Sequence, residues 1–88
     1  MDKFIVVWHK SAEDHLAELW ITSLAPNTVT RSADSIEQAL RENPDTLGDP
    51  LWNNTRIVYK YPLQVLFRVR PGDRIVEVLR VRLDVSAG

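Results

Sequence analysis

The stretch from Leu63 to Leu83 constrains the fold more than any other part of this chain. It reads LQVLFRVRPGDRIVEVLRVRL, in which two runs rich in Val, Leu, Ile and Arg flank the triplet Pro71-Gly72-Asp73. β-Branched and aromatic residues at alternate positions around a Pro-Gly turn are typical of an antiparallel hairpin. We therefore expect two long paired strands that contribute both to the hydrophobic core and to the functional surface of the protein.

The length of the loop at Pro71-Gly72 decides which side chains of this hairpin share a face. If the loop has an even number of residues, the helices cover Leu63, Val65, Phe67, Val69, Val76 and Val78. The opposite, half-apolar face then carries Gln64, Leu66, Arg68, Ile75, Glu77, Leu79, Val81 and Leu83. Arg68 and Glu77 can pair diagonally across that face. A three-residue loop would instead move one strand's side chains to the other face, so the register stays open.

Residues 11–44 carry the pattern of two amphipathic helices. Ser11 is expected to cap the first helix, which stops at Pro26, and Asn27 is expected to cap the second, which ends before Pro44. Their apolar stripes are Ala12, Leu16, Leu19, Trp20 and Leu24 in the first helix and Val29, Ala33, Ile36 and Leu40 in the second. With only a short corner between them, the two should form a helical hairpin.

Two further segments read as strands. Lys3 to Trp8 is apolar on both sides, which suggests partial cover on both faces, and Thr55 to Tyr61 precedes a turn at Pro62. Between them, residues 43–54 form a breaker-rich loop. Its large apolar side chains, which are expected to cover a core edge, are Leu47, Leu51 and Trp52. The tryptophans expected in or beside the core are Trp8, Trp20 and Trp52.

The resulting order is β-α-α-β-β-β. We expect one α+β domain over residues 1–88, with the helical hairpin packed on one face of a mostly antiparallel four-stranded sheet.

The formal net charge of −1 conceals an uneven distribution of charged residues. Residues 1–53 carry four basic groups against nine acids, and residues 54–88 carry seven against three. Such a separation can steer an anionic partner to the sheet, although solvated strand arginines explain it equally well. The absence of cysteine excludes disulfides and thiolate metal sites, and no apolar run is long enough to span a membrane. A cytoplasmic protein without a membrane partner or a cofactor is the simplest expectation.

Few residue clusters suggest chemistry. His9, Ser11, Asp14 and His15 lack the elbow and oxyanion loop of a serine-hydrolase site, and two histidines without an acidic cluster make a poor metal site. Capping and surface roles fit these histidines better. Further along the chain, basic residues alternate with aromatic ones, which suits contact with nucleic acid, although on its own the pattern fits a solvated edge strand better. These residues are Arg56, Tyr59, Lys60 and Tyr61.

Over nearly its whole length the chain resembles the RelE/ParE superfamily, the small toxins of bacterial type II toxin–antitoxin pairs associated with plasmid stabilization. The segments that carry the resemblance are the opening VVW, then SAEDHLAELW, then SADSIEQAL followed by NP and Gly48, and finally PLQVLFRVRPGDRIVEVLRV. The order, spacing and length of these segments agree together.

The resemblance implies a mechanism for members that cleave mRNA on the ribosome. Those members use Lys and Arg to hold phosphate and offset developing charge, often with a C-terminal Tyr. The family's arginine early in the penultimate strand falls at Gln64, its basic residue after the last strand falls near Asp84, and its histidine falls near Leu83. The Tyr has no counterpart before Gly88. The remaining catalytic candidates are Arg56, Lys60, Arg80 and Arg82.

The resemblance also implies a toxin that inhibits translation as an mRNA interferase acting on the ribosome. The alternatives are a gyrase-inhibiting toxin that hydrolyses nothing and a degenerate toxin that only binds its antitoxin. All three imply a cognate antitoxin partner, oligomerisation through it, and contact with the half-apolar hairpin face. The expected antitoxin contacts are Leu66, Arg68, Ile75, Leu79 and Val81.

Overall fold

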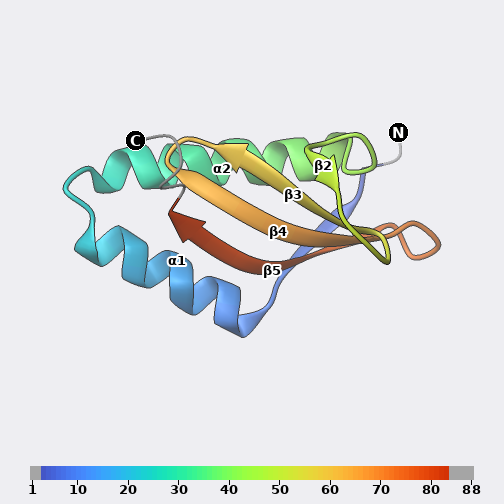
Figure 1. Cartoon of the computed structure of the whole chain (residues 1–88), viewed down its shortest axis with the longest axis horizontal. Coiled ribbons are helices and arrows are strands. Elements are labelled where there is room, and N and C mark those ends of the chain that lie inside the picture. The colour runs from blue at the N-terminus through green and yellow to red at the C-terminus, as the bar shows by residue number, and fades with distance from the viewer. Residues whose placement is uncertain (1–2, 84–88) are drawn as a thin grey trace.

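The computed structural model describes residues 3–83, which form two helices and a five-stranded sheet (Figure 1). The elements are β1 (Ile5–Trp8), α1 (Lys10–Thr22), α2 (Pro26–Glu42), β2 (Asp49–Pro50), β3 (Thr55–Lys60), β4 (Leu63–Arg70) and β5 (Ile75–Leu83). The strands lie in the order β1-β5-β4-β3-β2, where β1 runs parallel to β5 and every other neighbouring pair is antiparallel. The α+β fold with a helical hairpin on a mostly antiparallel sheet is confirmed. The fifth strand arises because two residues of the expected loop pair with β3.

The helices cover one face of the sheet. Helix α1 packs mainly along β5, and α2 contacts β1 and β4 (Figure 1). Four residues connect β4 to β5, an even number, and the predicted core-facing set of the hairpin is buried. Its members, none more than 4% exposed, are Leu63, Val65, Phe67, Val69, Val76 and Val78. No helix among residues 3–83 has the length and apolarity that a membrane-spanning helix needs.

A β-bulge changes the alternation in the middle of β5. Leu66 pairs with Arg80, whereas the next residue of β4, Phe67, pairs with Val78, so Leu79 is an extra residue on β5. The extra residue shifts every later side chain of β5 to the other face. Val81 therefore pairs with Val65 in the core and is only 2% exposed. The predicted position of Val81 on the half-apolar face was wrong for this reason.

Both helices begin earlier than the sequence suggested. His9 is the N-cap residue of α1, and its side chain makes no capping hydrogen bond. In α2 the N-cap is Ala25, followed by Pro26 in the first turn. Proline is favoured there because its fixed φ suits the helix and its missing N–H is not needed. Ser11 and Asn27 consequently lie inside the helices rather than at their caps.

Several large apolar side chains are more exposed than expected. Trp8 is partly buried and donates a hydrogen bond of 2.7 Å from Nε1 to Glu37 Oε1. Trp20 and Trp52 are exposed, at 49% and 63%. Of the loop residues, Leu47 packs against the core, but Leu51 remains exposed. In β1 the expected cover on both faces is likewise absent, because its outer residues, Ile5 and Val7, are exposed.

The segment after α2 is fixed against β3 by Gly48 and Arg56. Arg56 donates hydrogen bonds from Nε to the Leu47 carbonyl (2.8 Å) and from Nη2 to the Gly48 carbonyl (2.9 Å). Gly48 has a φ of +69°, and a Cβ atom there would collide with the backbone carbonyl of Ile57. Only glycine allows both this conformation and this close approach.

The glycines of the chain offer a matched test of this close approach. We expect Gly48→Ala to lower the free energy of unfolding by on the order of 3 kcal/mol, since it adds both strain and a backbone collision. The control Gly72→Ala meets no atom within 4 Å and should change the free energy by less than about 0.5 kcal/mol. Urea unfolding of both variants measures the difference. Equal losses in the two variants would contradict the close approach at Gly48.

Candidate functional site

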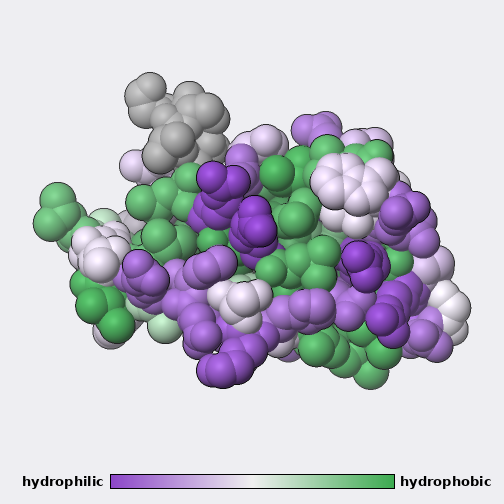
Figure 2. Space-filling model, turned by 60° about the horizontal axis from the view of Figure 1, so that its bottom comes forward, coloured by the Kyte–Doolittle hydropathy of each residue, from purple (hydrophilic) through white to green (hydrophobic). Residues whose placement is uncertain are grey.

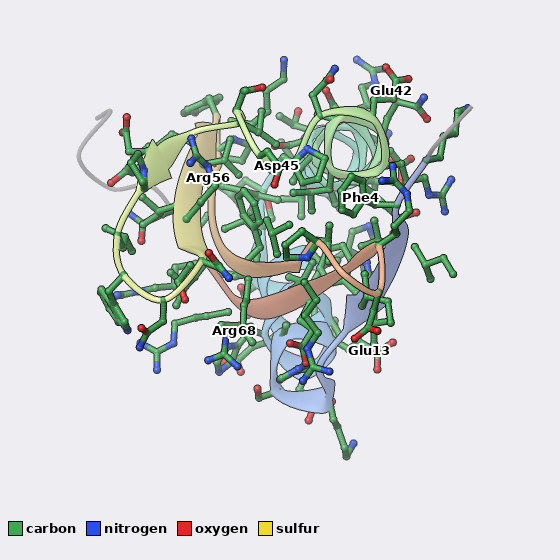
Figure 3. All side chains as sticks on the ribbon, turned by 90° about the vertical axis from the view of Figure 1, so that its right-hand side faces the viewer. Phe4, Glu13, Glu42, Asp45, Arg56 and Arg68 are labelled. Carbon is green, nitrogen blue, oxygen red and sulfur yellow. The ribbon has the colours of Figure 1, made fainter. Side chains whose placement is uncertain are left out.

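Among residues 3–83, no helix covers the side of the sheet opposite α1 and α2, and we call this side the open sheet face. Strand register places on it Ile5, Val7, Ile57, Tyr59, Gln64, Leu66, Arg68, Arg70, Ile75, Glu77, Leu79, Arg80 and Arg82. Figure 3 shows Arg68 on this side and Arg56 on the side of α2. In Figure 2 the molecule is turned so that the bottom of Figure 1 comes forward, and its surface there shows hydrophobic side chains interspersed with strongly hydrophilic ones.

Two arginines of β5 meet at a shallow hollow in the open sheet face. Arg80 lies opposite Leu66 and Arg82 lies opposite Gln64, and these four line the hollow together with Ile57. Among residues 3–83 neither arginine forms an ion pair, and neither does Arg68 on β4. Guanidinium groups without a carboxylate partner produce a positive potential that favours anions.

The four catalytic candidates from the sequence do not form one cluster. Arg80 and Arg82 lie together on the open sheet face. Arg56 lies opposite the buried Phe67, and its guanidinium holds the loop carbonyls on the helix side. Alternation along β3 places Lys60 on that same side, where it pairs with Leu63. The sheet therefore separates Arg56 and Lys60 from the two arginines of β5.

Four of the five predicted antitoxin-contact residues lie on the open sheet face. Arg68 is exposed, whereas Leu66, Ile75 and Leu79 are partly buried. Val81 does not belong to this face because of the bulge. The remaining four form a surface with both apolar and cationic character. Their contact with an antitoxin stays a prediction.

Glu77 forms a polar cluster with His9 and Arg70 on the open sheet face. Its Oε2 is 3.0 Å from His9 Nε2, and its Oε1 accepts a hydrogen bond of 3.0 Å from Arg70 Nε. The hydrogen bond with His9, followed by the charge and hydrogen bond of Arg70, lowers the pKa of the Glu77 carboxyl, although burial acts in the opposite direction. The expected pair with Arg68 was wrong, since Arg68 lies directly opposite Glu77 but makes no ion pair with it.

The polar residues at the start of α1 play a surface role. Lys10 and Asp14 form an exposed ion pair of 3.6 Å, and Ser11 and His15 are exposed. Residues 3–83 contain no group of three His, Cys, Asp or Glu side chains that could hold a metal ion.

The lowered pKa of Glu77 predicts acid sensitivity. A depressed pKa in the folded protein means that the unfolded chain binds a proton more readily at this carboxyl. The stabilisation that the charged Glu77 contributes is therefore fully present above the ordinary Glu pKa of about 4.3. It is lost as the pH falls through the lower pKa of Glu77 in the folded protein. We expect Glu77→Gln to be less stable than the parent at neutral pH and to lose less stability below about pH 4.3. Urea midpoints measured across this range test the expectation.

Glu18→Gln is the matched control, because Glu18 is an exposed carboxylate on α1 that forms no ion pair with residues 3–83. It should follow the acid profile of the parent. An unchanged acid profile in Glu77→Gln would contradict the role of this cluster.

Comparison with known proteins finds similarity at the level of structure. No protein-family profile matches the chain, and no curated protein sequence matches it. The RelBE2 toxin–antitoxin complex of Mycobacterium tuberculosis matches with a TM-score of 0.76 at 20% identity, covering 92% of this chain and 98% of that one. The chromosomal ParDE system of Pseudomonas aeruginosa matches with a TM-score of 0.68 at 14% identity, covering 94% and 98%. The YoeB/ParE toxin of Agrobacterium tumefaciens matches with a TM-score of 0.66 at 22% identity, covering 91% and 98%.

These structures span nearly the whole of both chains in each comparison, so the similarity concerns the complete domain rather than one motif. The arrangement of two helices on a mixed sheet, with a parallel first strand and a long final hairpin, is the RelE/ParE toxin fold.

Proposed function

We propose that this protein is the toxin of a type II toxin–antitoxin pair and that it inhibits translation by cleaving mRNA on the ribosome. The observation that carries the proposal is the position of Arg80 and Arg82, without carboxylate partners among residues 3–83, beside Gln64 on the open sheet face. The shared fold of the RelE/ParE toxins supports the toxin role in this proposal.

The chemistry required for this reaction suits the open sheet face. Attack of an RNA 2′-hydroxyl on the adjacent phosphorus breaks the bond to the 5′-oxygen, which takes up the proton, and leaves a 2′,3′-cyclic phosphate. Negative charge increases on the phosphoryl oxygens during this step, where guanidinium groups stabilise it. Tyr59 is 48% exposed and lies opposite Gln64, so its ring is available to stack on a base.

One observation favours a second candidate function. Gln64 provides no charge where mRNA-cleaving members of the superfamily carry an arginine, and the fold also matches the ParDE system. A toxin that binds DNA gyrase through the open sheet face, without hydrolysing anything, would need no residue of that kind. A chain that only binds an antitoxin would not need an arginine at this position either.

The antitoxin is proposed to bind the open sheet face. Leu66, Ile75 and Leu79 supply apolar contact, and Arg68 supplies a cation for an acidic residue of the partner. Three of the matched structures are toxin–antitoxin complexes, which supports a partner of this kind. Oligomerisation of the pair would then follow from the antitoxin.

Induced expression in bacteria tests the role of the two arginines. We expect the parent chain to arrest growth, and Arg80→Ala or Arg82→Ala to relieve the arrest, since removing one such charge-stabilising donor costs about 100- to 1000-fold in rate. Arg31→Ala is the control, because it removes the same charge from an exposed position on α2. Circular dichroism confirms that each variant folds. Growth arrest that persists in both β5 variants would exclude these arginines from the site.

A second measurement separates the candidate functions. New transcript 5′ ends within translated regions during arrest would support mRNA cleavage, whereas loss of DNA supercoiling with intact transcripts would support gyrase inhibition. Unimpaired growth with the parent chain would contradict both toxin functions and leave antitoxin binding.

A further inference from the structure

A pocket lies between α1 and the C-terminal half of β5, and we call it the α1–β5 pocket. It has a volume of about 420 Å³. Its lining includes His15, Glu18 and Leu19 from α1 and Arg80, Arg82 and Leu83 from β5. The same two arginines also line the hollow beside Gln64 on the open sheet face. Arg80 and Arg82 therefore border two hollows, and a histidine lines one of them.

The α1–β5 pocket exists because β1 is shorter than β5. The last residue of β1, Trp8, pairs with Val78, and no strand among residues 3–83 pairs with this edge of β5 beyond that point. Helix α1 runs along this part of β5 instead (Figure 1). His15 and Glu18 are three residues apart on α1, so their side chains are neighbours on one face of the helix. Both consequently lie beside the two arginines of β5.

His15 is the only imidazole among the residues that line the two hollows. Imidazole is the side chain that ordinarily gains or loses a proton between about pH 5 and 8, whereas arginine keeps its proton throughout. The charged groups that line the pocket with His15 are Glu18, Arg80 and Arg82. His15 is exposed and forms no ion pair with residues 3–83, so its ring is accessible to a substrate.

We propose that His15 gives a proton to the leaving 5′-oxygen when RNA is cleaved beside Arg80 and Arg82, an inference that rests on the mRNA cleavage proposed above. The 2′-oxygen forms its bond to phosphorus and loses its proton to water, while the bond between phosphorus and the 5′-oxygen breaks. The imidazolium of His15 protonates the departing 5′-oxygen and becomes neutral imidazole, which regains a proton from water afterwards. The two arginines stabilise the phosphoryl oxygens during the same step.

A substrate whose leaving group needs no proton provides the test. Ribosomes are programmed with an mRNA in which the linkage that the parent chain cleaves carries either the ordinary 5′-oxygen or a bridging 5′-sulfur, which leaves as a thiolate. We expect His15→Gln to slow cleavage of the ordinary linkage by about 100-fold or more, and cleavage of the sulfur-bridged linkage by less than about threefold. Single-turnover rates with the purified full chain measure both effects.

Two control variants separate proton transfer from other causes of a lower rate. Arg82→Ala removes a charge that stabilises the phosphoryl oxygens, so it should slow cleavage of both linkages alike. Ser11→Ala changes an exposed residue that lies one helical turn before His15 and does not line the pocket, and it should keep the parent's rate on both linkages. Circular dichroism verifies that each variant folds.

Two results would overturn the inference and leave the proposed function intact. One is cleavage of the ordinary linkage by His15→Gln at the parent's rate. The other is an equal loss of rate on both linkages, because a proton donor to the 5′-oxygen matters only where that oxygen is present. Failure of the parent chain to cleave either linkage would instead contradict mRNA cleavage itself, and the inference with it.

Discussion

Burial of alternate apolar side chains along β4 and β5 is the interaction on which the rest of the structure depends. Phe67, Val65, Val76 and Val78 are fully buried, and each contributes roughly 1.5–3 kcal/mol by leaving water. Their burial against the helices fixes which side of the hairpin is covered. It also leaves both long edges of the hairpin available, one for the parallel strand β1 and the other for β3. The side chains that alternate with these buried ones along β4 and β5 lie on the opposite face, where they form the open sheet face with its arginines.

The sequence was most informative where a pattern is local. Alternation in the hairpin correctly predicted six core positions, because a strand reverses its side chains at every residue and the loop proved to have an even length. The bulge was missed, although a signal was present. Glu77, Arg80 and Arg82 are polar at spacings of three and then two, which no regular strand can place on one face. That irregular spacing indicates an extra residue between Glu77 and Arg80, and the strand register places it at Leu79.

The missed parts of the candidate site depend on contacts between distant segments. His9 and Glu77 are 68 residues apart and meet only because β1 pairs in parallel with β5. The separation of Arg56 from Arg80 similarly depends on the register between strands, which composition does not reveal. Trp20 was expected in the core because it belongs to an apolar stripe. The stripe of α1 is wider than the surface that the sheet covers, and sequence alone does not say which edge of a wide stripe remains exposed.

The bulge at Leu79 has a consequence for how this chain can change in length during evolution. Leu79 is one residue more than β4 requires, so loss of its codon would restore regular pairing and keep Val81 inside and Arg82 outside. Loss of a codon before the bulge, at Glu77 for example, would instead move side chains next to the deletion from the covered face to the open face, or the reverse. Related chains that differ in length by one residue in this strand are therefore expected to differ at the bulge. An alignment that places the gap elsewhere would assign core residues to the surface.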